Sequence, residues 1–582
     1  METTNLSKIR RDKMLNTINE IKNNISDEET LTNLSMIENE LTKKKYGLIW
    51  EEHEERVDKE LETQIPTFEE VKDKEIISKP DENFNFLLEG DNLHSLYLLE
   101  KTHKGKIDVI YIDPPYNTGS KDFIYNDKII DDEDGYKHSK WLSFMEKRLK
   151  IAHKLLNNSG IIFISIDDNE IAQLKMLCDN IFNEENRLSI HHIQVRYAEK
   201  SLADGKAVKP VMEYVLIYAK DINQFKLNLP KEEYTDSSFV YKIKELNEGT
   251  LIKNGSTEIQ IFKPGEWEIE KKTESSQNLL KETWVSGTIY SKMSYGQVVR
   301  KYIEPRYEVD GLGCLYKVIG RGDDGLGYRY YVGPAKNGST RCKMYSGMPL
   351  SRVDEINNGG SYREVPISNL LNFAPDFGNI RHEGNMTFNS GKKPVKMLKE
   401  LINYHINKNS IVLDFFAGSG STAQAVLELN NEDNGNRQFI LCTNNENNIC
   451  EDITYKRIKN VITGYGKYNP LKSNLKYYKC AYIPRINTEK ENLHNNLLIN
   501  IKNLIQLENG IEIDDNKIRI YLEENELDKF STTQEELEIC DKVYISSDIL
   551  LTSEQEKIFE DNNIEVYIIP EYYFENEIME VM

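Results

Sequence analysis

Five short, mostly apolar runs, each preceded or followed by a helical pattern, restrict this chain to a small set of folds. They lie at 84–89, 107–112, 161–166, 410–416 and 437–442. Strands that are apolar along their whole length are buried on both faces, which is typical of parallel sheets covered by helices. The sequence therefore predicts an α/β fold with a parallel sheet flanked by helices.

The regular alternation is interrupted in the middle of the chain, where glycine and tyrosine dominate and the strand-like pieces are short. Two amphipathic helices with a period near 3.6 open the chain, and Ser26 and Asp27 could cap the second of them. We expect five segments: N-terminal helices and a connector (1–80), a first α/β half (81–220), an inserted irregular α+β region (221–375), a second α/β half (376–475) and a small separate acidic α/β domain (476–582).

Composition excludes several classes of protein. Hydrophobic residues make up 39% of the chain, but no apolar stretch is long enough to span a bilayer, so no membrane is expected. The N-terminus lacks the apolar middle of a secretory signal, which favours a cytoplasmic protein. None of the seven cysteines forms a Cys-x-x-Cys pair, so the sequence suggests neither a zinc site nor a disulfide framework.

The net charge of −22 is unevenly distributed. Residues 481–582 hold 8 Lys/Arg against 24 Asp/Glu, whereas residues 291–350 hold 10 Lys/Arg against 5 Asp/Glu. An acidic surface repels nucleic acid, but a basic island can still bind phosphate. The acidic residues 481–582 form either a surface that binds a protein partner or a surface that is simply solvated.

The run at 107–112 ends in Asp113-Pro114-Pro115-Tyr116. Proline fixes φ and has no N–H, so this loop is rigid and rich in hydrogen-bond acceptors. Pro-Pro also marks ordinary surface turns. The position at the end of a buried strand favours a functional loop.

A second motif, Asp414-Phe415-Phe416-Ala417-Gly418-Ser419-Gly420, follows the run at 410–416 and precedes a helix. Glycines there allow a sharp turn and the close approach of a ligand to the backbone. The spacing is neither that of a dinucleotide fold nor that of a P-loop. Glu446 ends the next apolar run, where an acid can accept hydrogen bonds from ribose hydroxyls or can be a plain surface residue.

Together these motifs resemble the Asp-Pro-Pro-Tyr and Phe-x-Gly-x-Gly motifs of S-adenosylmethionine-dependent DNA amino-methyltransferases, in the motif order of their β class. The blocks "GDNLHSLYLLEKTHKGKIDVIYIDPPYNTGSKDFIYND", "WLSFMEKRL", "GIIFISIDDNE" and "TNNENNICEDITYKRI" resemble the modification subunit of type III restriction-modification systems. The resemblance covers roughly residues 45–465. Met212 departs from it, because family members often carry His-Glu-Tyr where this chain has Met212-Glu213-Tyr214.

The resemblance implies a site-specific methyltransferase that moves a methyl group from S-adenosyl-L-methionine to N6 of a flipped adenine, without a metal. The Asp113 carboxylate and the Pro114 carbonyl would accept hydrogen bonds from the amine, and Tyr116 would stack on the extruded base. The implied catalytic residues are Asp113, Pro114, Pro115 and Tyr116. The implied cofactor-binding residues are Asp91, Lys393, Pro394, Asp414, Phe415, Ala417, Gly418, Gly420 and Glu446.

The middle region is the candidate for reading the DNA sequence, because cations contact phosphates and guanine edges while tyrosines stack. Alternatively, it is an irregular β domain whose tyrosines form its core. Its cations are Arg300, Lys301, Arg306, Lys317, Arg321, Arg329, Lys336, Arg341 and Lys343, and its tyrosines are Tyr302, Tyr307, Tyr316, Tyr328, Tyr330, Tyr331 and Tyr345.

The resemblance further implies double-stranded DNA as substrate, a homodimer and a helicase-nuclease restriction subunit as partner, with the N-terminal helices and residues 481–582 as plausible contact surfaces. Two other functions remain open. One is an N4-cytosine methyltransferase, although those enzymes more often have Ser in place of Asp113. The other is a specificity subunit that binds DNA without catalysis, which the intact Asp-Pro-Pro-Tyr motif disfavours.

Overall fold

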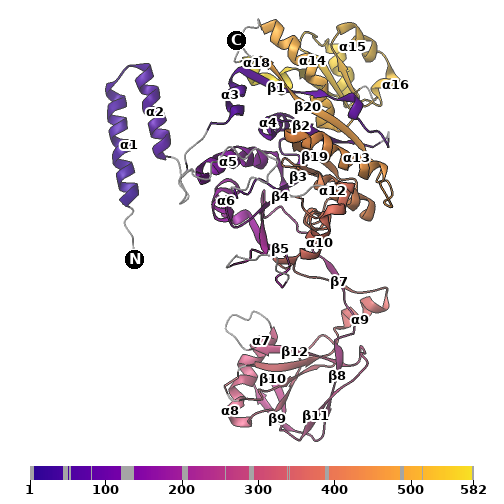
Figure 1. Ribbon diagram of the computed structural model, residues 1–582. Helices are drawn as coiled ribbons and strands as arrows, with labels where there is room; N and C mark the ends of the chain where they lie inside the picture. Colours follow the sequence, from indigo (N-terminus) through magenta and orange to yellow (C-terminus); the bar gives the residue numbers. More distant parts are fainter. Residues whose placement is uncertain are drawn as a thin grey trace. The chain divides into compact units, whose positions relative to one another are not determined.

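The protein consists of two units, one built from residues 1–228 and 368–582 and the other from residues 229–367 (Figure 1). The computed structural model describes residues 6–42, 50, 54–79, 82–118, 137–199, 208–255, 257–286, 294–336, 338–339, 341–386, 392–484, 490–513 and 516–579. A bilayer-spanning helix, long and apolar throughout, does not occur within these ranges.

A ten-stranded sheet forms the centre of the first unit. Its strands, in spatial order, are β1 (Gln64–Glu70), β20 (Asn474–Pro484), β2 (Phe84–Glu89), β19 (Gln438–Thr443), β18 (Ile411–Asp414), β3 (Ile107–Ile112), β4 (Leu156–Ile166), β6 (Met212–Ala219), β5 (Arg187–Gln194) and β17 (Leu370–Asn372). The strands from β20 to β4 run parallel to one another, whereas β1 and β6 are antiparallel to their neighbours. The predicted α/β fold is confirmed, with a sheet that is mixed rather than wholly parallel.

Two sets of helices pack against this sheet. The first set, in order of contact, is α14 (Lys490–Asn509), α4 (Asn92–His103), α5 (Lys137–Leu155) and α6 (Ile171–Cys178). The second set is α11 (Val395–Ile402), α12 (Ser421–Asp433) and α13 (Lys456–Thr463). Because helices cover it in this way, the parallel strands are buried, which explains their predominantly apolar sequences.

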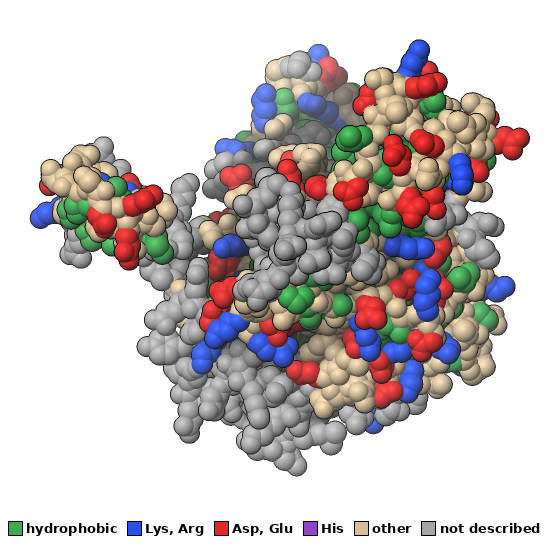
Figure 2. All heavy atoms as spheres, turned by 90° about the horizontal axis from the view of Figure 1, so that it is seen from above, with side chains coloured by type: hydrophobic (Ala, Val, Ile, Leu, Met, Phe, Trp, Pro, Cys, Tyr) green, Lys and Arg blue, Asp and Glu red, His purple; other side chains and the backbone are tan. Residues whose placement is uncertain are grey.

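A three-stranded parallel sheet ends the chain: β21 (Ile518–Tyr521), β22 (Lys542–Ser546) and β23 (Glu565–Ile569), with α15 (Glu524–Ser531), α16 (Gln534–Leu537), α17 (Ser553–Asp561) and α18 (Glu571–Met579). Figure 2 looks onto these C-terminal elements and shows many acidic side chains among them. Tyr544, Ile569 and Tyr573 belong to the same apolar cluster as the ten-stranded sheet. The C-terminal elements therefore share part of the first unit's core, while Leu527, Phe530 and Phe559 belong to an apolar cluster of their own, and the predicted domain stays a prediction.

One end of the ten-stranded sheet takes two strands from the predicted flanking segments. β1 comes from the supposed N-terminal connector and β20 from the supposed C-terminal domain, and the two pair antiparallel from Gln64 to Glu70. Pro66 lies within β1, and proline is tolerated in an edge strand such as this one. A strand pattern such as that of β20 does not say which sheet the strand joins.

The second unit contains an eight-stranded antiparallel sheet. In spatial order its strands are β11 (Trp267–Lys271), β8 (Phe239–Glu245), β12 (Leu280–Ser286), β15 (Arg341–Ser346), β14 (Tyr328–Val332), β13 (Leu315–Ile319), β10 (Thr257–Phe262) and β9 (Thr250–Asn254). Val298 and Val299, at the end of α7 (Ser294–Val298) and just after it, are buried in an apolar cluster with residues of this sheet. A short pair, β7 (Lys231–Glu233) and β16 (Tyr362–Glu364), lies near the two ends of the unit's chain, which also contains α8 (Tyr307–Asp310) and α9 (Leu350–Asn357).

Two helices, α1 (Leu6–Asn24) and α2 (Glu28–Thr42), form a hairpin near the N-terminus. Lys22 forms an ion pair with Glu38 at 2.6 Å, which links the two helices. Asp27 caps α2 by accepting a hydrogen bond from the Thr30 N–H at 2.8 Å, as the sequence predicted for this position. α3 (Arg56–Thr63) then leads into β1.

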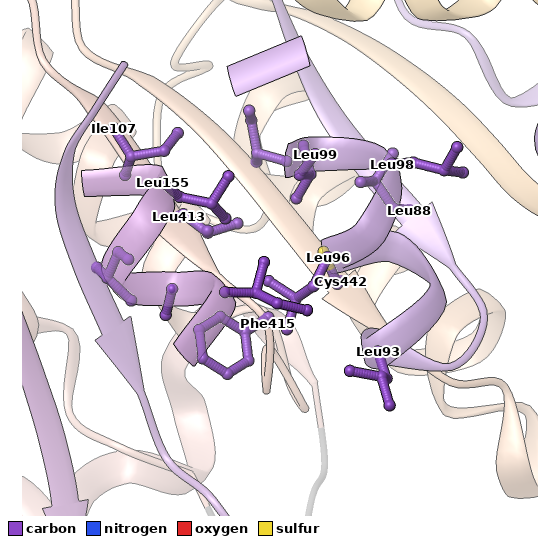
Figure 3. Packing of buried hydrophobic residues seen from close by; sticks show 14 of the residues in the cluster. Leu88, Leu93, Leu96, Leu98, Leu99, Ile107, Leu155, Leu413, Phe415 and Cys442 are labelled. Atoms are coloured by element: carbon purple, nitrogen blue, oxygen red, sulfur yellow. The ribbon is translucent and has the colours of Figure 1, made fainter. Parts of the chain in front are cut away.

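The apolar core between the sheet and α4 brings distant parts of the chain together. Leu96 and Leu99 of α4 belong to one cluster with Leu413 of β18, Phe415 of the second motif and Cys442 of β19 (Figure 3). All five are essentially inaccessible to solvent. The loops that follow β18 and β19 are therefore anchored by buried side chains immediately before them.

One buried cation stabilises the edge of the sheet. The Lys476 ammonium on β20 lies 2.6 Å from Glu70, 2.7 Å from Glu75 and 2.5 Å from Glu512, and its side chain is fully buried. These three carboxylates could in principle hold a metal ion, but the ammonium already neutralises part of their charge.

We expect Lys476→Met to destabilise the protein by about 3–5 kcal/mol, because removal of one partner leaves buried carboxylates without their cation. Lys72→Met is the matched control: Lys72 pairs with Glu70 and Glu512 but its side chain is 63% exposed, so its loss should cost less than about 1 kcal/mol. Urea denaturation of both variants checks this. Equal denaturation midpoints would show that burial of the Lys476 cluster contributes nothing.

Candidate functional site

Four loops meet at one edge of the ten-stranded sheet, because β2, β19, β18 and β3 are neighbouring parallel strands. Asp91 follows β2, Glu446 follows β19, Asp414 ends β18 and Asp113 follows β3. Val412 pairs with Val109, so the two predicted motifs leave the sheet side by side. The carboxyl edge of parallel strands is where such folds bind ligands.

The Asp-Pro-Pro-Tyr loop is held rigidly. Trp141 of α5 donates a hydrogen bond from Nε1 to the Pro115 carbonyl at 2.8 Å. The Pro114 carbonyl accepts no hydrogen bond from a residue that the structure describes. Burial raises the pKa of Asp113, and the neighbouring Lys393 ammonium opposes that rise.

Lys393 contacts both the first and the last residue of this loop, Asp113 and Tyr116. Its buried ammonium donates hydrogen bonds to Tyr116 Oη at 2.7 Å and to Glu213 Oε2 at 2.9 Å, and lies 3.2 Å from Asp113 Oδ1. Burial lowers the pKa of Lys393, but Asp113 and Glu213 more than offset this, so the pKa is raised overall. The sequence placed Lys393 among the cofactor residues, whereas the structure brings it to the catalytic motif.

Glu213 is a site residue that the sequence analysis missed. It stands at the start of β6, and its Oε2 accepts hydrogen bonds from Tyr116 Oη at 3.2 Å and from Lys393. Because β6 is antiparallel to β4, its N-terminal end lies at the same edge as the carboxyl ends of the parallel strands. Only the unusual Met212-Glu213-Tyr214 sequence drew attention to this stretch, and it gave no sign of the strand direction.

The glycine turn after β18 is tightly constrained. Gly418 and Gly420 have φ values of 48° and 74°, which favour glycine. Gly420 N donates to the Ala417 carbonyl at 2.8 Å, and Ala417 N donates to the Cys442 carbonyl of β19 at 3.1 Å. A Cβ at Gly420 would come within 3.1 Å of Thr454 Cγ2. Within the turn, Ala417, Ser419 and Gly420 are buried, whereas Phe416 and Gly418 are partly exposed.

The acid of this motif is buried and internally bonded. Asp414 accepts hydrogen bonds from Phe416 N at 3.0 Å and from Thr422 Oγ1 at 2.5 Å. Burial raises the pKa of Asp414 to about 7, although these two hydrogen bonds act in the opposite direction. Phe415 is fully buried in the core, and its carbonyl already accepts a hydrogen bond from Asn92.

Asp91 has a structural role in addition to any ligand role. As the N-cap of α4 it accepts a hydrogen bond from Leu93 N at 2.8 Å, and Arg148 Nη2 lies 3.5 Å from the same oxygen. Asn92 donates to the Phe415 carbonyl at 2.8 Å, which ties the loop after β2 to the glycine turn.

The remaining predicted residues are Pro394 and Glu446. Pro394 is buried at the N-cap of α11 and places Lys393 at the site. Glu446 is exposed just beyond β19. The structure therefore gathers all the predicted residues at one edge, and which of them contact ligands stays a prediction.

A known protein family covers the part of the chain that forms this site. Residues 107–456 match the family model for DNA methylases. The chain belongs to this DNA methylase family. The match includes both motifs, Lys393 and Glu446.

Several curated relatives share this part of the chain. The type III restriction-modification enzyme StyLTI Mod subunit of Salmonella typhimurium is 31% identical over 68% of this chain and 60% of its own length. The type II methyltransferase M.KpnI of Klebsiella pneumoniae is 30% identical over 65% of this chain and 85% of its own. The chain thus spans about three fifths of the StyLTI relative.

Solved structures are more distant. The PvuII cytosine-N4-specific DNA methyltransferase is 10% identical, with a TM-score of 0.30 over 68% of this chain and 100% of its own. The M1.HpyAVI–SAM complex is 12% identical, with a TM-score of 0.27 over 64% of this chain and 98% of its own. Scores this low support no detail of the site.

Proposed function

We propose that this chain is a site-specific DNA methyltransferase that transfers a methyl group from S-adenosylmethionine to N6 of adenine in double-stranded DNA. The observation that carries the proposal is the parallel pairing of β3 with β18, because the loop that carries Asp113 and the glycine turn follow neighbouring strands at the same edge of the sheet. Membership of the DNA methylase family supports the reaction class.

The residues at the sheet edge fit S-adenosylmethionine. Gly418 and Gly420 let a ligand approach the backbone, and Asp91 and Glu446 offer carboxylates on neighbouring loops. Asn444 Oδ1, just beyond β19, is buried and accepts no hydrogen bond from the part of the chain that the structure describes, so a ligand donor could satisfy it. When bound, S-adenosylmethionine supplies a methyl group activated by a sulfonium.

The Asp113 cluster can hold and activate an amine. An exocyclic amine is a poor nucleophile because its lone pair is delocalised into the ring, and acceptors on its N–H bonds localise that pair. The Asp113 carboxylate and the unoccupied Pro114 carbonyl are suitable acceptors. With Glu213 and Lys393 the cluster carries a formal charge of −1, which favours a positive charge developing on the amine.

Tyr116 is held in place by the same cluster. Its hydroxyl bonds to Lys393 and Glu213, and the Lys393 ammonium lies 4.8 Å from the ring centroid. Ordering the ring before the base arrives lowers the entropic cost of stacking against an extruded base.

We infer adenine rather than cytosine from Asp113 and from the type III relatives, and we propose that the chain acts as a type III modification subunit with a restriction subunit and a second copy as partners. A stand-alone methyltransferase is the second candidate, since the chain covers 85% of the type II enzyme M.KpnI.

Nucleoside mass spectrometry of DNA treated with the purified protein should detect N6-methyladenine. Asp113→Ala should lower the methylation rate by at least ~100-fold, because it removes the acceptor for the reacting amine. Asp167→Ala is the control: Asp167 follows β4 at the same edge. N4-methylcytosine would refute the adenine assignment, and unmodified DNA would refute the activity.

Lys393→Met should move the acidic limb of the pH–rate profile to higher pH. Methyl transfer requires the Asp113 carboxylate, so the rate falls as pH drops through the pKa of Asp113. Lys393 holds that pKa down against burial, and its loss should raise it further. Lys396→Met, at an exposed position of α11, is the control. An unshifted limb would contradict this role.

The second unit is our candidate for DNA contact, and its cations fall into two groups. Arg306, Lys317, Arg329 and Lys343 form ion pairs with acids of the same unit. The other cations are exposed and form no ion pair with a described residue: Arg300, Lys301, Arg321, Lys336 and Arg341. Five of the seven tyrosines are buried, so the core interpretation holds for Tyr302, Tyr316, Tyr330, Tyr331 and Tyr345.

Alanine at Arg300, Lys301 and Arg341 together should weaken DNA binding and flatten its salt dependence. The slope of log affinity against log salt concentration should become shallower by about 0.9 for each phosphate that the variant no longer neutralises. Lys253→Ala, at an exposed lysine already paired with Glu258, should change neither quantity. Fluorescence anisotropy at several salt concentrations measures both. An unchanged salt slope in the triple variant would exclude these three side chains from the interface.

A further inference from the structure

A fully buried arginine lies beneath the glycine turn. Arg457 of α13 donates hydrogen bonds from Nη1 to Ser421 Oγ at 2.7 Å and to Ser419 Oγ at 3.2 Å. Its Nε donates to Gln424 Oε1 at 3.0 Å. Arg457 therefore supports the turn and the first turn of α12 from the protein side, and the mechanism above does not use it.

The same guanidinium reaches a second segment. Arg457 Nη2 lies 3.5 Å from Glu383 Oε2. The Glu383 carboxylate also accepts the Val395 N–H at 3.2 and 3.3 Å. Because Pro394 has no N–H, the Val395 amide is the first free donor of α11, and Glu383 takes the place of a side-chain cap.

The segment that carries Glu383 is fastened to α13. Gly384 has a φ of 68°, and a Cβ there would lie 2.5 Å from Arg457 Cγ, so only glycine fits without displacement. Its carbonyl accepts from Asn460 Nδ2 at 3.2 Å, and its N–H donates to Tyr465 Oη at 3.2 Å. Glu383 is thus held at a defined position between α13 and the start of α11.

These contacts form a continuous connection from Ser419 and Ser421 through Arg457 and Glu383 to the start of α11, where Lys393 meets Asp113. We propose that Arg457 and Glu383 are a positioning pair that sets the glycine turn and Lys393 in register, so that the methyl donor and the amine acceptor are correctly spaced. This inference rests on the proposed function. Neither residue is catalytic, because each acts through the groups it holds.

A purely structural ion pair is the competing explanation. A buried pair contributes little net stability, and loss of one partner destabilises the fold. Such a role predicts lower melting temperatures with unchanged ligand affinity and rate in the folded fraction. A positioning role predicts changes in affinity and rate at temperatures where the variant is fully folded, since a misplacement of about 1 Å can cost ~100-fold in rate.

The test compares Glu383→Gln, Arg457→Gln and the double variant with the wild-type chain. Calorimetric titration gives the Kd for S-adenosylhomocysteine, and single-turnover methylation of DNA gives the rate at saturating cofactor. Glu383 does not touch the glycine turn, and its side chain is 25% exposed, so Glu383→Gln should fold. We expect it to raise the Kd roughly threefold to tenfold and to lower the rate ~10- to 100-fold.

The double variant decides whether the two residues act together. If they form one connection, the double variant is no worse than Arg457→Gln, because effects in a shared network are not additive. Lys399→Gln is the matched control, since Lys399 lies on α11 and pairs with Glu428 at 3.1 Å, and it should leave both quantities unchanged.

The proposal would be overturned if Glu383→Gln had the wild-type Kd and rate. It would also be overturned if the fold-changes of the two single variants multiplied in the double variant. Should Arg457→Gln fail to fold, the Glu383→Gln comparison decides alone. If the wild-type chain binds S-adenosylhomocysteine but methylates no DNA, the proposed function fails, and the Kd values still test the positioning pair.

Discussion

The parallel pairing of β18 with β3 is the constraint on which the site depends. Val412 and Leu413 lie beside Val109 and Ile110, so the chain leaves both strands at the same edge and in the same direction. Asp113 and Asp414 are roughly 300 residues apart in the sequence, yet only the spacing between two strands separates the starts of their loops. If this pairing were broken, Asp113 would be separated from the glycine turn even if both loops kept their own conformations.

The second requirement is electrostatic. Asp113 and Glu213 are two carboxylates at a half-buried position, and like charges there would push one of them towards protonation. The Lys393 ammonium lies 3.2 Å from the Asp113 carboxylate and 2.9 Å from the Glu213 carboxylate and offsets part of this repulsion. Because one cation serves two acids, the cluster retains a negative charge while the hydrogen bonds fix Tyr116. The same residues thus provide an acceptor, a counter-ion and an ordered aromatic ring.

The sequence predicted the parts of the site that follow simple rules. Apolar strands followed by acids or glycines indicate the carboxyl edge of a parallel sheet, and Asp113, Asp414 and Glu446 all lie there. It missed Glu213, since that residue lies at the N-terminal end of its strand and reaches the edge only because β6 runs in the opposite direction. Strand direction is set by tertiary pairing and has no local signature.

Other features have the same origin. The sequence placed Lys393 with the cofactor residues, which stays a prediction, but it gave no sign of the contacts of Lys393 with Asp113 and Tyr116, because a motif does not give the direction of a side chain. Arg457 looked like any helical arginine, and its burial beneath the turn follows from the packing of α13 on α12. β1 and β20 were assigned to flanking segments because a strand pattern does not name its partner.

The order of the motifs along the chain has little effect on this geometry. A parallel sheet places every carboxyl end at one edge, so the half with Asp113 can precede or follow the half with the glycine turn. The chain leaves the first unit after residue 228 and returns at residue 368. Asn228 donates to the Asn403 and Tyr404 carbonyls at 2.9 Å, and β17 pairs with β5 soon after the return. Both ends of the insertion are therefore anchored to the sheet unit. Since the entropic cost of a longer connection grows only slowly with its length, a whole unit can be inserted there without disturbing the pairing of β3 with β18.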